Sequence, residues 1–168
     1  MNEKRRLLGM TLDELKGVAF EAGLPGYAAK QMADWLYKKK VTSIAAMTNI
    51  ASAKRALLEK NFEVGAVPPS DLMKSVDGTI KYLYPAGPGN FVESVYIPTE
   101  DRATLCVSSQ VGCKMNCLFC MTGKQGFTKN LSANEILNQI QSLPETEELT
   151  NIVFMGMGEP LDNVDELF

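Results

Sequence analysis

The sequence contains no histidine, one tryptophan and only four cysteines. Without histidine, the chain cannot form a Ser-His or Cys-His nucleophile pair, or a zinc site that needs imidazole. Apolar residues make up 45% of the 168 residues, enough for a hydrophobic core, but they occur in short runs. No run approaches the roughly 20 apolar residues that cross a bilayer, and no basic leader precedes a signal-length apolar stretch. We therefore expect a cytoplasmic protein.

Charge is divided unevenly along the chain. Residues 1–60 hold 11 Lys and Arg against 6 Asp and Glu, a net charge of +5, whereas residues 61–168 hold 6 against 14, a net charge of −8. A basic module on an acidic body indicates a polyanionic partner, most commonly RNA or DNA. A solvated, lysine-rich helix face would produce the same charge, and no arginine-rich or aromatic single-strand signature accompanies it.

Apolar periodicity predicts a first domain of three helices, residues 1–61. Thr11 and Glu14 form a capping box ahead of apolar residues spaced three and four apart, and Gly23 ends that helix. A second helix should close at residues 38–40, three lysines that suit the negative end of a helix dipole. A third should cover residues 51–60. We interpret this domain as a basic helical accessory module that binds RNA.

Short extended runs separated by turn residues follow, at residues 79–84 and 91–97, and they predict a β-meander over residues 62–100. Residues 101–168 then alternate strand, loop, helix and strand. The first strand is predicted over residues 102–108 and leads straight into a loop with three cysteines, the helix begins at a capping box of Ser132 and Glu135, and the last strand covers residues 151–155. This order predicts a parallel sheet with its site at the carboxyl ends of the strands. The fold class is therefore α/β: a small three-helix module and a β-meander, followed by the first βα units of a truncated partial (β/α) barrel.

Cys113, Cys117 and Cys120 fall within eight residues on the loop after a predicted strand. With no secretory context, metal binding is a better interpretation than disulfides. Thiolates are soft ligands that suit an iron-sulfur cluster or zinc, and three of them on a four-iron cluster leave one iron open to a substrate. A structural zinc site with Cys106 as fourth ligand is the alternative, although it would pull Cys106 out of an apolar strand.

The C-x3-C-x2-C spacing, with Phe119 before the last cysteine, resembles the signature of the radical S-adenosylmethionine (SAM) superfamily. There the cysteines hold a [4Fe-4S] cluster whose open iron binds SAM, and one electron cleaves SAM to methionine and a 5′-deoxyadenosyl radical. Residues 156–160, GMGEP, would alone be an ordinary glycine turn. Beside such a loop they resemble the superfamily motif that holds the methionine amino group, which implies that Gly158 and Glu159 bind SAM.

Four runs together resemble the RlmN family, whose relative is Cfr: FVESVYIP at 91–98, RATLCVSSQVGC at 102–113, QGF at 125–127, and GMGEP. The resemblance implies methylation of C2 of adenosine in 23S rRNA and tRNA, through a methyl-cysteine and a transient disulfide. It also implies an electron donor such as flavodoxin. Glu93 matches the family's proton acceptor, and Cys106 matches the cysteine that forms the transient disulfide.

Residue type and strand position alone, without the resemblance, support a separate interpretation of Cys106 and Glu93. Cys106 lies between two apolar residues and is typical of a small, buried core residue. Strand alternation places Glu93 on one face with Phe91, Val95 and Ile97. We expect that face to be buried, where a carboxylate is costly unless it is paired or used.

A complete (β/α)8 barrel takes about 250 residues, so we expect an N-terminal fragment that is inactive alone. Unpaired strand edges recruit further strands, so we also expect self-association through exposed edges. Two other functions stay open: an RNA-binding module without catalysis, and a zinc-binding interaction domain.

Overall fold

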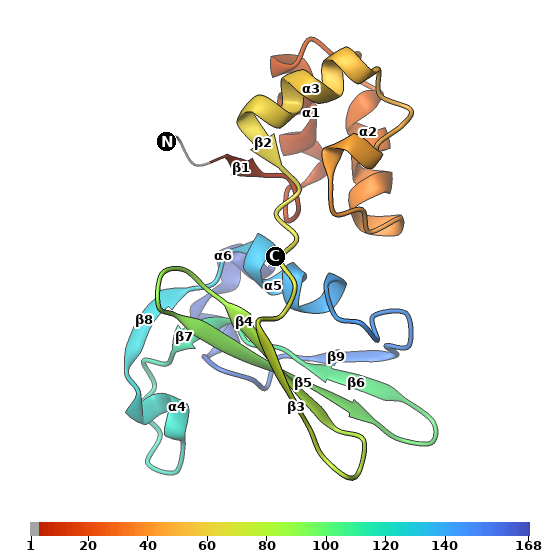
Figure 1. Cartoon of the computed structure of the whole chain (residues 1–168). Helices are drawn as coiled ribbons and strands as arrows, with labels where there is room; N and C mark the ends of the chain where they lie inside the picture. The colour runs from red at the N-terminus through yellow and green to blue at the C-terminus, as the bar shows by residue number, and fades with distance from the viewer. Residues whose placement is uncertain (1–3) are drawn as a thin grey trace. The chain divides into compact units, whose positions relative to one another are not determined.

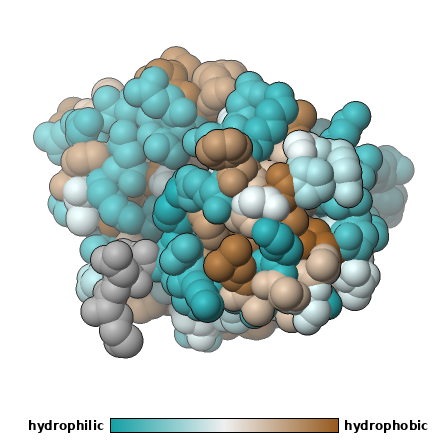
Figure 2. Space-filling model, turned by 90° about the horizontal axis from the view of Figure 1, so that it is seen from above, coloured by the Kyte–Doolittle hydropathy of each residue, from teal (hydrophilic) through white to brown (hydrophobic). Residues whose placement is uncertain are grey.

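The computed structural model describes residues 4–168 (Figure 1). The chain divides into two compact parts, a helical unit that ends at Ala66 and a sheet unit, Val67–Phe168. Figure 2 shows hydrophilic residues over much of one face of the molecule, with apolar residues between them. Within residues 4–168, no helix is both long and apolar enough to span a membrane.

The helical unit contains the three expected helices. α1 begins with the predicted capping box, in which the Thr11 hydroxyl accepts from the Glu14 N–H and the Glu14 carboxylate accepts from the Thr11 N–H. α2 runs on into a π-helical turn, η1, and two short strands, β1 and β2, pair in parallel. The bounds are β1 Arg5–Arg6, α1 Leu12–Glu21, α2 Ala28–Ala33, η1 Asp34–Lys38, η2 Ile44–Ala46, α3 Ser52–Asn61 and β2 Phe62–Glu63.

The sheet unit is built on five strands in the order β3-β4-β5-β6-β9, which are β3 Asp71–Lys74, β4 Ile80–Pro85, β5 Phe91–Pro98, β6 Ala103–Cys106 and β9 Asn151–Val153. The first four are antiparallel, and β9 joins β6 in parallel. The meander and the first parallel pair therefore form one continuous sheet. α5 Ala133–Gln141 packs over one face, where Ile136 joins a core with Tyr82 and Leu105.

A second, two-stranded sheet pairs β7 Gln110–Gly112 with β8 Phe127–Asn130 in antiparallel fashion. The expectation of one strand over residues 102–108 running straight into the cysteine loop is therefore wrong. β6 ends at Cys106, and the Gln139 side chain from α5 pairs both backbone groups of Ser108, with N–H···O distances of 2.9 Å each way. Short elements complete the unit: α4 Met121–Lys124, η3 Pro160–Asp162 and α6 Val164–Leu167.

The edge strand β3 has no counterpart in the sequence prediction. All four of its residues are exposed, so it lacks the alternation of apolar and polar residues that marks a half-buried strand. Its pairing with β4 through backbone bonds makes it a strand.

Candidate functional site

The loop that carries the cysteines is closed at its base by β7 and β8. The Cys113 N–H donates to the Gly126 carbonyl at 3.1 Å, just beyond the last residue of β7. A Cβ on Gly112 would lie 1.8 Å from the same carbonyl oxygen, and Gly112 has a φ of +76°. Glycine is required there because only a residue without a side chain lets the two strands approach this closely.

The three loop cysteines are free thiols in different surroundings: Cys113 and Cys120 are partly buried and Cys117 is exposed. The Cys113 sulfur lies 3.5 Å from the Met115 N–H, and the Cys120 N–H donates to the Cys117 carbonyl at 3.0 Å. The pKa of the Cys120 thiol is lowered, first by the backbone N–H of Gly123 and then by Thr122. Hydrogen-bond donors thus already favour the thiolate at one proposed ligand.

The structure places these cysteines on one loop without gathering them. In residues 4–168 no three His, Cys, Asp or Glu side chains are close enough together to hold a metal ion, and this includes any set with Cys106. The donor set fits an iron-sulfur cluster by its chemistry, because three soft thiols lie on a short loop with a fixed base. Metal sites form together with the local fold, so a loop with this donor set can close when a metal binds.

Residues 156–160 follow β9 and run beside residues 107–110. The Met157 N–H donates to the Ser108 hydroxyl at 2.9 Å, and the Met157 carbonyl accepts from the N–H of Ser109 at 2.9 Å. A Cβ on Gly156 would lie 2.7 Å from the Val107 carbonyl oxygen. Residues 107–110, which lead into the cysteine loop, are therefore in direct backbone contact with residues 156–160, which we call the glycine segment.

Gly158 and Glu159 lie at the end of that contact. Gly158 has a φ of +98°, and a Cβ there would lie 2.5 Å from the Cβ of Gln110. The Glu159 N–H donates to Gln110 Oε1 at 2.9 Å, and its carboxylate caps η3 by accepting from the Leu161 N–H. In this structure Gly156 and Gly158 let the backbone approach residues 107–110, the segment that leads into the cysteine loop.

Glu93 and Cys106 share the face of the sheet opposite α5. Cys106 is paired with Val95 across β5 and β6, and the Ser108 hydroxyl donates to the Glu93 carbonyl at 2.6 Å. Glu93 and Cys106 are therefore diagonal neighbours on adjacent strands, about 7–8 Å apart by sheet geometry. Burial raises the pKa of the Cys106 thiol, partly offset by the Met155 N–H, so the thiol stays protonated at neutral pH.

The expectation that Glu93 lies on the buried face of its strand is wrong. α5 covers the other face of β5, so Val92, Ser94 and Tyr96 are the buried residues of that strand. Glu93 is half-exposed and forms an ion pair with Lys81 at 2.9 Å. The pair borders a hollow of about 110 Å³, which is lined by Asp71, Leu72, Met73, Lys81, Leu83 and Glu93.

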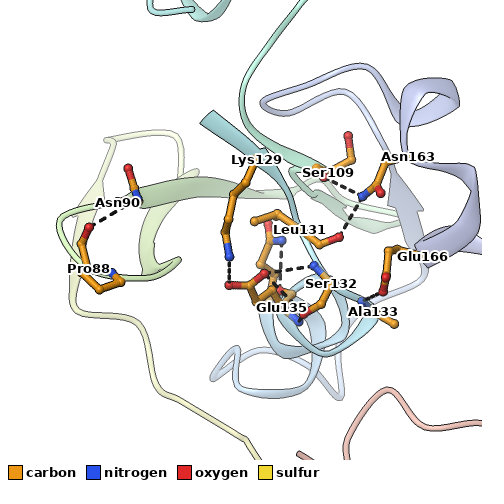
Figure 3. A network of polar contacts seen from close by, with 11 residues as sticks. Pro88, Asn90, Ser109, Lys129, Leu131, Ser132, Ala133, Glu135, Asn163 and Glu166 are labelled. Carbon is orange, nitrogen blue, oxygen red and sulfur yellow. Dashed lines mark hydrogen bonds and ion pairs between the residues drawn. The ribbon is translucent and has the colours of Figure 1, made fainter. Parts of the chain in front are cut away.

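Sequence reasoning missed the buried amides that connect the site. Figure 3 shows the Asn163 side chain donating to the carbonyls of Ser109 and Leu131, at 2.9 and 2.8 Å. Gln110 is fully buried and bonds to three other residues. The polar run SSQ within an otherwise apolar stretch was the available signal, because a buried polar side chain needs partners.

Comparison with known proteins gives consistent findings for both units. Residues 5–64 match the family model of the ribosomal RNA large subunit methyltransferase N-terminal domain, and residues 107–168 match that of the radical SAM superfamily. A crystal structure of a radical SAM methyltransferase from Sphaerobacter thermophilus has a TM-score of 0.87 and 37% identity, over 97% of this chain and 50% of its own.

Two curated relatives show where the similarity lies. A probable dual-specificity RNA methyltransferase RlmN from Parabacteroides distasonis is 82% identical over all of this chain and 49% of its own length. The dual-specificity RNA methyltransferase RlmN of Geobacter sulfurreducens is 46% identical over 95% of this chain and 44% of its own length. The chain thus spans about half the length of the curated relatives it matches, and it belongs to the RlmN family within the radical SAM superfamily.

Proposed function

We propose that this chain forms the N-terminal part of a radical SAM RNA methyltransferase that methylates C2 of adenosine in 23S rRNA and tRNA. The observation that carries the proposal is the direct contact between the base of the cysteine loop and residues 156–160. A cluster on the loop and a SAM molecule on the glycine segment would thereby be neighbours. Cleavage of SAM by one electron from the cluster requires that arrangement.

Each proposed site residue has a role that its surroundings support. Cys113, Cys117 and Cys120 would hold a [4Fe-4S] cluster, which supplies one electron and an open iron for SAM when bound. Gly158 and Glu159 would hold the methionine amino group, since a carboxylate accepts a strong hydrogen bond from an ammonium.

The face of the sheet opposite α5, which we call the open face, would take part in the methyl transfer itself. Glu93 would accept the proton released from adenine C2, and Cys106 would form the transient disulfide with the methyl-carrying cysteine. The burial-raised pKa of Cys106 suits a thiol that must stay unreactive until the adduct forms, because the thiolate is the nucleophile. The methyl-carrying cysteine would come from the half of the RlmN sequence that this chain does not match.

We propose that the chain alone has no methyltransferase activity, because the methyl-carrying cysteine would not be part of it. We also propose that it self-associates through the edge strands of its sheet. The order of strands leaves β3 and β9 at the edges, and unpaired edges recruit further strands. The whole enzyme would draw its electron from a donor such as flavodoxin.

Anaerobic reconstitution with iron and sulfide tests the cluster. We expect about four irons per chain, following the three-thiolate ligand set, and loss of the cluster in Cys113→Ala, Cys117→Ala and Cys120→Ala. Cys106→Ala is the matched control and should keep the iron. If Cys106→Ala also released the metal, a four-cysteine zinc site would replace the proposal.

The helical unit is proposed to contact the RNA phosphates. The +5 charge of residues 1–60 and the three lysines at positions 38–40 support this, as does the match to a ribosomal RNA methyltransferase N-terminal domain. Replacing all three lysines by glutamine should weaken binding and lower the salt slope by up to about 2 to 3, since each phosphate contact releases counterions. An unchanged slope would remove these lysines from the interface.

A further inference from the structure

The fully buried amide of Gln110 connects three segments of the sheet unit. Its Nε2 donates to Asn130 Oδ1 at 2.9 Å and to Asp162 Oδ2 at 2.8 Å, while its Oε1 accepts from the Glu159 N–H at 2.9 Å. Gln110 itself belongs to β7, the strand that leads into the cysteines. One side chain of β7 therefore bonds to β8, the other strand at the base of the cysteine loop, and to the segment that follows β9.

A second contact reaches further along the cysteine loop. Lys114, directly after the first cysteine, forms an ion pair with Asp162 Oδ2 at 2.9 Å and lies over the Phe127 ring at 4.3 Å. The same carboxylate oxygen thus accepts from Gln110 at the base of the loop and from Lys114 within it. Asp162 is about three-quarters buried, so the two bonds to it are only partly screened by water.

Asn163 supplies the opposite half of the connection. From the segment after β9, its buried amide donates to carbonyls on either side of the cysteine hairpin, those of Ser109 and Leu131 (Figure 3). The two segments are therefore linked in both directions by buried side chains.

We propose that Gln110, Lys114 and Asp162 are positioning residues that hold the cysteine loop, residues 113–120, against the glycine segment, residues 156–160. The inference rests on the proposed function, in which the first segment holds the cluster and the second holds SAM. Lys114 is the adjustable member, because it is half-exposed and belongs to the loop that must close around metal. The network fixes the relative position of the two segments before any ligand binds.

Hydrogen exchange on the metal-free chain tests the network, so its outcome does not depend on whether a cluster assembles. Asp162→Ala should accelerate exchange of the Cys113 and Gly126 amides about tenfold, since it removes charge-assisted bonds to the other segment. Lys114→Met should in turn accelerate exchange of the Met157 and Glu159 amides. The coupling is reciprocal because each variant breaks the same contact.

Two further variants separate positioning from general stability. Lys114→Arg keeps a cation beside Asp162 and should restore slow exchange in residues 156–160. Asp13→Ala removes another Lys–Asp contact, 2.7 Å long, from α1 of the helical unit and should leave both segments unchanged. Acceleration confined to the mutated segment, or spread evenly over the whole sheet unit, would overturn the proposal, as would failure of Lys114→Arg to restore protection.

Discussion

The helical unit and the sheet unit are stabilised in different ways. The helical unit buries an apolar cluster that includes Leu15, Met32 and Leu58, and its first helix is fixed by a local capping box. In the part of the chain that the structure describes, every buried polar side chain belongs to the sheet unit: Ser94, Ser108, Ser109, Gln110, Asn134, Asn138, Gln139 and Asn163.

The difference follows from what each unit must hold. Helices satisfy their own backbone groups, so apolar packing is enough to assemble them. The sheet unit has to hold irregular loops around its proposed site, and their backbone groups need partners. Asn138, for example, pairs both the N–H and the carbonyl of Val67 at 2.8 Å, as Gln139 does for Ser108. Buried amides thus take the place of ladder bonds where the strands stop.

The largest expected effect concerns the helical core. Leu15→Ala should destabilise the helical unit by about 4 kcal/mol, because it removes a fully buried side chain and leaves a cavity. Urea unfolding followed by the fluorescence of Trp35, the only tryptophan, reports on this unit alone. The control is Leu12→Ala on the same helix, where the side chain is 42% exposed and the cost should be small. Equal losses would mean that α1 does not bury Leu15 more deeply than Leu12.

The matching change in the sheet unit is Gln139→Leu. We expect a loss of about 3 kcal/mol, because the N–H and carbonyl of Ser108 would be left buried without partners. Hydrogen exchange of β6 and β9 measures the loss. Gln141→Leu makes the same substitution two residues further along α5, at a half-buried position, and should be nearly neutral. If leucine at position 139 stabilised the unit, apolar packing would suffice there too.

The sequence predicted the helical unit more completely than the sheet unit, because the signals for helices are local whereas the sheet unit depends on contacts between distant residues. Capping boxes at Thr11 and Ser132 are local signals, and both were confirmed. The break after Cys106 depends on Gln139, 33 residues away, which no local pattern reports. The face of Glu93 was assigned wrongly because alternation separates two faces but does not say which one α5 covers.

Alkaline pH should weaken the sheet unit through its buried tyrosines. Burial raises the pKa of Tyr84 to about 12. The pKa of Tyr96 is also raised to about 12, mainly by a hydrogen bond to Glu148 and to a lesser extent by burial. The stability from a neutral Tyr84 is fully present below pH ~10, its unfolded value, and is lost as pH rises through about 12.

At pH 11 the loss from Tyr84 is about 1.4 kcal/mol. Urea unfolding followed by far-ultraviolet circular dichroism at pH 9 and 11 measures it, and Tyr84→Phe should flatten the decline. Tyr37→Phe is the control: burial raises the pKa of Tyr37 in the helical unit, so this change should flatten only the decline reported by Trp35. A pH-independent sheet unit would contradict the burial of Tyr84.

The smallest expected effect is at the proposed proton acceptor. Lys81→Met should change the stability of the sheet unit by less than about 1 kcal/mol, because the Lys81–Glu93 pair is half-exposed and water screens it. Lys129→Met is the matched comparison, since its partner Glu135 is only 13% exposed and also caps α5, and it should cost more. Urea unfolding of both variants ranks them. If Lys81→Met were the costlier change, Glu93 would lie in a buried environment, and the open face could not present its carboxylate to a substrate.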